Sequence, residues 1–105
     1  MEKKYKRFRD FYPYYLAEHT HPICRALHFA GSCLVLAIVA TSILTGNANW
    51  LWAALFAGYG FAWVGHFFFE KNRPATFTYP LFSFVADWVM FFQLLAGKIP
   101  FNAKA

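Results

Sequence analysis

The sequence contains no Asp, Glu, Lys or Arg between Ala26 and Phe69, and this charge-free run limits the folds that the chain can adopt. A run of this length holds two segments of about 20 residues, the length that crosses the hydrocarbon core of a bilayer. Hydrophobic residues make up 59% of the chain and charged residues 14%, whereas soluble domains have about 45–50% and about 25%. We therefore expect an all-α integral membrane protein, with residues 1–105 forming a single membrane domain.

Helix-start and turn signals divide the apolar sequence into three helices. Pro22 and Pro80 each suit the first turn of a helix, and the stretch TGNAN between the first two helices has the composition of a turn. Asn72-Arg73-Pro74 ends the second helix. The fold predicted from these signals is a bundle of three membrane-spanning helices, over residues 22–45, 50–71 and 80–97.

The N-terminal segment, residues 1–21, is basic and aromatic. It carries much of the net charge of +5, and a basic cluster that leads into spanning helices marks the cytoplasmic side. We therefore expect the N-terminus and the connection 71–80 in the cytoplasm, and the turn 46–49 outside. Contact with anionic headgroups explains the cluster better than nucleic-acid binding. Aromatic residues at helical spacing predict an amphipathic interfacial helix: Phe8, Phe11, Tyr12 and Tyr15.

Each predicted span carries a polar pair near its cytoplasmic end, with the two residues three or four positions apart and so on one helix face. Ionisable groups inside membrane segments are costly and suggest a functional site. The start of the first helix and the end of the second lie on the same side of the membrane, so a helical hairpin would bring their pairs together. The pairs are Arg25 and His28, His66 and Glu70, and Ser83 and Asp87.

All four histidines lie at or near these cytoplasmic ends, which suggests a metal site. Imidazole suits zinc, copper, iron and nickel, and a set that includes a carboxylate suits Fe(II) or a hydrolytic Zn(II). We predict His28 and His66 as ligands, and His19 precedes Pro22 and can fold back toward them. A further position stays open between Glu70, His21 and water. A hydrogen-bonding role at the interface is the simpler interpretation of His21.

Two sequence elements resemble a known family. The stretches YLAEHTHPICRALHFAG, residues 15–31, and GHFFFEKNRPATFTYPLFSFVAD, residues 65–87, are similar to small membrane proteins related to the fungal 2-hydroxy-fatty-acid dioxygenase of α-oxidation. The resemblance runs from about residue 11 to 97. It implies an enzyme that uses Fe(II) and O2 to shorten a 2-hydroxy fatty acid by one carbon. The short chain resembles bacterial members, which implies an inner-membrane location.

The resemblance also implies roles for residues. His19, His28 and His66 match the histidines thought to hold the iron. The chemistry of the other polar residues suggests further roles: Glu70 is a fourth ligand or the group that orients His66. Asp87 and Glu70 are the candidate catalytic carboxylates. Arg25 and Arg73 are candidates for binding the substrate carboxylate, since guanidinium groups pair with it in a bidentate manner; anchoring to headgroups is the alternative. The acyl chain would lie among the apolar helices or in adjacent lipid.

Two other functions fit the residues. A membrane zinc hydrolase of a lipid amide or ester would use metal-activated water with Asp87 or Glu70 as base. In a non-enzymatic scaffold, the polar pairs would only hold helices together. The partners expected are membrane lipids, O2 and the hydroxy acid, and the sequence leaves room for a homo-oligomer.

Overall fold

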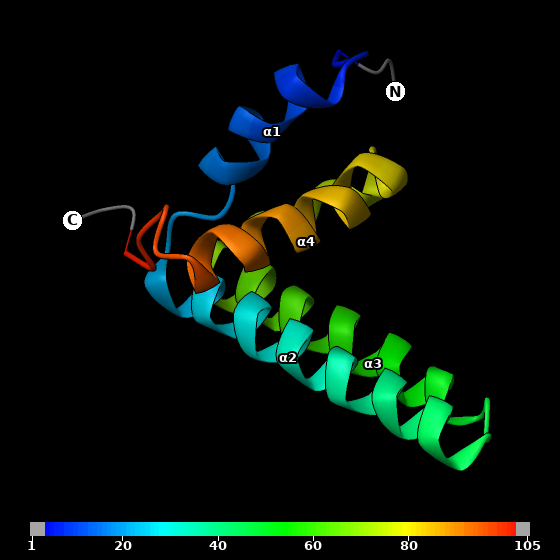
Figure 1. The fold of residues 1–105 in the computed structure, drawn as a ribbon. Coiled ribbons are helices and arrows are strands. Elements are labelled where there is room, and N and C mark those ends of the chain that lie inside the picture. Colours follow the sequence, from blue (N-terminus) through cyan, green and yellow to red (C-terminus); the bar gives the residue numbers. More distant parts are fainter. Residues whose placement is uncertain (1–3, 103–105) are drawn as a thin grey trace.

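The charge-free run folds as a helical hairpin in the computed structural model, which describes residues 4–102 (Figure 1). Helix α2 spans Pro22–Thr45, and α3 spans Trp50–Val64 and continues without a break into the π-helix η1, Gly65–Glu70. Pro22 starts α2, and Gly46 ends it in the left-handed conformation with φ 67°, as Gly allows at little cost. The predicted boundaries of both helices are confirmed to within about a residue.

Both arms of the hairpin are long and apolar enough to cross a membrane, α2 with 24 residues and α3 with η1 with 21. The arms approach closely where glycine replaces a side chain. A Cβ atom on Gly31 would lie 2.9 Å from the Cβ of Phe61, and one on Gly65 would lie 3.0 Å from Cys24 Sγ. The hairpin therefore places the start of α2 directly beside η1, as predicted.

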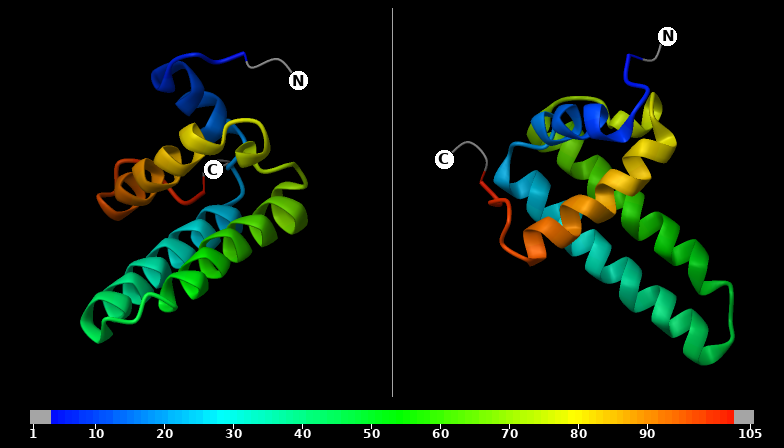
Figure 2. Two further views of the ribbon diagram at one scale, coloured as in Figure 1. Left: turned by 90° about the vertical axis from the view of Figure 1, so that its right-hand side faces the viewer. Right: turned by 45° about the horizontal axis from the view of Figure 1, so that its top comes forward.

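The other two α-helices lie at one end of the hairpin. Helix α4, Pro80–Leu95, crosses the hairpin there, and α1, Phe8–Ala17, packs over α4 (Figures 1 and 2). A short 3₁₀-helix, η2, Ala75–Phe77, belongs to the connection between η1 and α4. Phe11 and Tyr15 of α1 pack with Ala86 and Met90 of α4 in the buried core.

The all-α class is confirmed, and the described residues form four α-helices with no strand. The third spanning helix is not confirmed. Helix α4 has 16 residues, or about 24 Å at 1.5 Å per residue, and a hydrocarbon core is about 30 Å thick. The residues that flank α4 also contact the first quarter of the chain. Before α4, Tyr79 Oη accepts a hydrogen bond from the Lys4 backbone N–H. After α4, the Pro100 carbonyl oxygen accepts one from Arg25.

Part of the aromatic face of α1, the helix predicted to be interfacial, is buried against protein. Phe11 and Tyr15 are 0% and 1% exposed. Helical periodicity identifies an apolar face but does not tell what covers it, and here α4 does. Of the basic tail predicted at the N-terminus, residues 1–3 lie outside the described range.

Candidate metal centre

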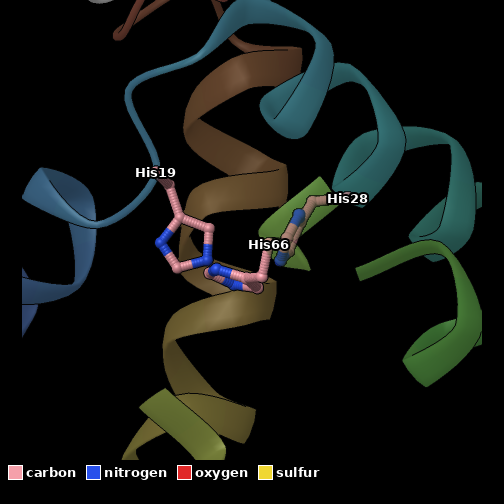
Figure 3. Close-up of side chains that lie close together, drawn as sticks. All are labelled: His19, His28 and His66. Carbon is pink, nitrogen blue, oxygen red and sulfur yellow. The ribbon is translucent and has the colours of Figure 1, made fainter. Parts of the chain in front are cut away.

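Three of the four histidines meet where the hairpin contacts the other helices. His19 comes from the loop between α1 and α2, His28 from α2 and His66 from η1. One nitrogen from each ring can be chosen so that all three lie within 4.8 Å of one another. Figure 3 shows the three imidazoles turned toward one another. The predicted meeting of these histidines is confirmed, and among the described residues they form a group that could hold a metal ion.

The hydrogen bonds of His19 and His28 fix which nitrogen is free. Nδ1 of His19 contacts the Tyr15 carbonyl oxygen at 2.5 Å, and Nδ1 of His28 contacts the Cys24 carbonyl oxygen at 2.9 Å. A carbonyl oxygen can only accept, so each Nδ1 carries the proton and donates. In the neutral ring the lone pair then lies on Nε2, the form in which imidazole binds metals.

His66 is oriented by Asn72. The Asn72 amide nitrogen donates to the carbonyl oxygen and to the carboxylate of Glu18, at 3.0 and 3.1 Å. Its amide oxygen therefore faces His66, whose Nδ1 donates to it at 2.7 Å. Such partners behind a metal-binding histidine fix the tautomer and the ring orientation. In the sequence, Asn72 is recognisable only as part of the signal that ends the helix, and its place six residues after His66 carries no recognisable signal.

The three nitrogens fit a metal ion. The His19, His28 and His66 side chains are 1%, 7% and 2% exposed, and His19 Nε2 is buried without a hydrogen-bond partner. Burial and the neighbouring His28 and His66 lower the pKa of His19 well below its ordinary value, so this ring is neutral. A buried nitrogen without a partner is costly, and a divalent ion bound by the three Nε2 atoms would satisfy it.

A small cavity of about 10 Å³ adjoins all three rings, which is near the minimum volume that holds one water molecule. Ser83 and Asp87 of α4 also line it. Ser83 Oγ is buried with no hydrogen-bond partner. Asp87 Oδ1 accepts a hydrogen bond from the Tyr15 hydroxyl, and the Tyr15 ring stacks on His19 with 4.0 Å between the centroids. An oxygen-bearing ligand could therefore bind here.

Glu70 lies outside the histidine cluster. Its carboxylate accepts hydrogen bonds from the His21 backbone at 2.6 Å and from Thr20 Oγ1 at 3.3 Å. It thereby fixes the loop that carries His19. His21 also lies apart from the cluster, and its Nδ1 accepts from the Ile23 backbone at 3.1 Å. His21 is therefore the N-cap of α2, in agreement with the simpler interpretation.

The two arginines differ in their surroundings. Arg25 is 4% exposed and donates to the carbonyl oxygens of His19 and Pro100, so its guanidinium group holds two backbone segments beside the site. Arg73 is exposed and precedes Pro74, which lines the small cavity. Of the two predicted carboxylate-binding arginines, Arg25 is therefore engaged by the backbone, and Arg73 is exposed near the cavity.

The fold and the site define an all-α protein with two helices able to cross a membrane and a buried three-histidine centre at one end of them. The model of the 2-hydroxy-palmitic acid dioxygenase Mpo1-like family matches residues 5–99, so the chain belongs to this family. No curated protein and no solved structure matches the chain. The family name supports a dioxygenase-like activity on a fatty acid.

Proposed function

We propose that the protein is an Fe(II)-dependent membrane dioxygenase that shortens 2-hydroxy fatty acids by one carbon. The observation that carries this proposal is the convergence of three buried imidazoles, one with an unpartnered nitrogen, in a chain of this family. When bound, iron supplies the redox chemistry that allows O2 to react with an organic acid. Zinc has no redox chemistry, so it does not suit a dioxygenase.

The proposed reaction balances without an added reductant. A 2-hydroxy acid, RCH(OH)COOH, and O2 give RCOOH, CO2 and H2O. The bond between the carboxyl carbon and the hydroxyl-bearing carbon breaks, and the latter becomes the new carboxyl group. The substrate loses four electrons, and one O2 accepts them. O2 consumption and CO2 release should therefore be equal.

Residues of the chain have distinct roles in this proposal. His19, His28 and His66 hold the ion, and Ser83 and Asp87 face the same small cavity. We assign to Asp87 the acceptance of the proton from the 2-hydroxyl group, because it is the carboxylate that lines this cavity. The Ser83 hydroxyl donates a hydrogen bond to a substrate oxygen.

Outside the cavity, Glu70 and Arg25 position the His19 loop through their hydrogen bonds to it. Exposed Arg73 attracts the substrate carboxylate toward the site.

The test is metal content and O2 uptake on protein purified anaerobically in detergent. Wild type should contain about one iron per chain, as one three-histidine site implies, and consume O2 with 2-hydroxyhexadecanoic acid. His66→Ala should lose both properties. The matched control is His21→Asn, which removes the fourth histidine but keeps an N-cap acceptor, and it should retain both.

A zinc hydrolase is the second candidate, because three histidines with an open position also hold catalytic zinc. Stoichiometric zinc with turnover of a lipid ester in the absence of O2 would favour it. Both the dioxygenase and the hydrolase require His66 as a metal ligand. Metal content and turnover that stay at the wild-type level in His66→Ala would therefore contradict both.

We further propose a two-span topology, with the N-terminus in the cytoplasm of a bacterium and both chain ends on that side of the inner membrane. The contact of Arg25, near the start of α2, with Pro100 supports it. A reporter active only in the periplasm should be active when inserted at the 46–49 turn and inactive when fused to the C-terminus. Activity of the C-terminal fusion would restore the three-span prediction.

A further inference from the structure

A second, larger cavity of about 310 Å³ extends from the histidine site along the hairpin. On α2 it is lined by residues three or four positions apart, which form one stripe along the helix: His28, Ser32, Val35 and Val39. On the antiparallel α3 its lining continues to Leu51, near the turn at the far end of the hairpin. We call this cavity the hairpin groove. Its volume is at the lower limit of ordinary ligand sites, about 300 Å³.

The hairpin groove adjoins the small cavity beside the candidate metal centre. His28, Tyr59, Ala62 and Asp87 line both. The polar lining residues lie at this shared end, and beyond Ser32 the lining from α2 and the first half of α3 is apolar. Leu51 and Leu55 are about half exposed, at 48% and 49%, so the groove is open on its side. A ligand that fits must have one polar end and a long apolar chain.

The length of the groove fits a long alkyl chain. Val39 lies eleven residues after His28, or about 16 Å along the helix at 1.5 Å per residue. With C–C bonds of about 1.52 Å, an extended chain advances by roughly 1.25 Å per carbon, so about 13 carbons lie between the two residues. Val35 lies seven residues after His28, or about 10 Å, which corresponds to about 8 carbons.

We infer that the hairpin groove binds the alkyl chain of the 2-hydroxy acid, with the carboxyl end at the histidines and the chain directed toward the 46–49 turn. This inference rests on the proposed function and adds to it. It places the alkyl chain in the groove between α2 and α3 and not in the surrounding lipid. The residues along the groove then determine which substrate chain lengths the protein accepts. Gly58 is such a position, since it lines the groove and a Cβ atom there would lie in van der Waals contact with Val35 Cγ2, at 3.4 Å.

The test places side chains at two depths and measures kcat/KM for three substrates: 2-hydroxyoctanoic, 2-hydroxydodecanoic and 2-hydroxyhexadecanoic acid. Gly58→Leu should spare only the shortest substrate, because it fills the groove opposite Val35. Val39→Phe should spare the two shorter substrates. Each blocked substrate should lose about tenfold or more in kcat/KM, since displacing two methylenes at about 0.8 kcal/mol each already costs that much.

The matched control is Gly60→Leu, the same substitution on the same helix. Gly60 is exposed, and a Cβ atom there would meet nothing within 4 Å. It should leave all three substrates unchanged, and iron content should stay at the wild-type level in every variant. Equal losses for all substrates, or no loss with the longest one, would refute the groove as the chain site and leave the proposed function intact.

A second readout does not depend on turnover. A 2-hydroxyhexadecanoic acid with a photoreactive diazirine at its last carbon should cross-link to residues near Val39 and Leu51, and Gly58→Leu but not Gly60→Leu should suppress this product. Cross-links spread over exposed residues such as Leu44 and Phe56 would show a chain lying in detergent or lipid and would overturn the inference. If wild type lacks turnover but cross-links in the groove, the proposed function fails and the chain site stands.

Discussion

Replacing Asn72 by Ala should weaken metal binding although Asn72 is not a ligand. Asn72 Oδ1 accepts a hydrogen bond from His66 Nδ1 at 2.7 Å, and the Asn72 side chain is itself fixed by two hydrogen bonds to Glu18. It thereby directs Nε2 of His66 toward the other two rings. Without it, the imidazole can rotate or change tautomer, and either change removes one of the three donor atoms from the site.

The size of the effect follows from burial. His66 is 2% exposed, so its Nδ1–H would lack an acceptor, which costs about 1–3 kcal/mol. At 1.4 kcal/mol per tenfold, this corresponds to about 5- to 150-fold in the metal dissociation constant. The loss of comparable partners in other proteins weakens metal binding by about 10–100-fold. The assay is anaerobic competition for Fe(II) against a chromogenic chelator in detergent.

Two further variants make the Asn72 result decisive. Asn72→Asp keeps an oxygen for His66 but removes both donations to Glu18 and adds a carboxylate beside it, so its affinity should lie between those of wild type and Asn72→Ala. Asn49→Ala, at the opposite end of the hairpin, should bind as wild type does; its side chain makes no cap hydrogen bond in the structure. Unchanged affinity in Asn72→Ala, or equal weakening in Asn49→Ala, would refute the reasoning.

Three further predictions concern the supports of the site. Arg25→Lys should lower the free energy of unfolding by about 1–3 kcal/mol, because lysine cannot reproduce both guanidinium donations to backbone carbonyls; thermal unfolding at fixed iron content measures this. Gly65→Ala should cost about 1–3 kcal/mol by overpacking, since its Cβ would lie 3.0 Å from Cys24 Sγ, whereas Gly60→Ala should not. Removal of iron by a chelator should speed tryptic cleavage at Arg9 of α1, and an unchanged rate would show that α1 stays docked without metal.

The sequence was sufficient to predict the hairpin and the meeting of its histidines. A charge-free run with one turn signal leaves few arrangements other than two antiparallel helices, and His28 and His66 then lie at similar depth. Their contact, with 5.2 Å between ring centroids, confirms that reasoning. His19 could be placed as well, because Pro22 fixes where the helix starts and leaves His19 in the loop before it.

The partner of His66 could not be predicted, because the residue pattern does not show how the chain turns at the end of the helix. In an α-helix, with 3.6 residues per turn, residues four positions apart share a face, and this spacing suggested that Glu70 is the partner of His66. In the structure both residues lie in a π-helix. Lys71, the residue after this helix, adopts the left-handed conformation with φ 60° and turns the chain back, so that the Asn72 backbone N–H donates to the His66 carbonyl oxygen at 3.1 Å. The Asn72 side chain thereby lies beside His66, and Glu70 accepts hydrogen bonds from the His19 loop.

The sequence also could not predict that α4 crosses the hairpin. An apolar segment of about 17 residues is compatible with a short membrane span and with a core helix, and composition does not separate the two. The difference lies in distant contacts, such as those of Tyr15 with Asp87 and of Tyr12 with Gln93. These contacts hold α1 against α4, so that the two helices pack on each other outside the hairpin.

The metal centre lies at the junction of parts that the sequence connects only through loops. His28 and His66 belong to the hairpin, His19 follows α1, and Ser83 and Asp87 come from α4. Tyr15 contacts both His19 and Asp87, so the packing of α1 on α4 determines where the third ligand lies. Because an ion that binds only the assembled site stabilises that assembly, metal binding at this candidate site should be coupled to the docking of α1. Any variant that loosens α1 from α4 should therefore weaken metal binding even when all three histidines are unchanged.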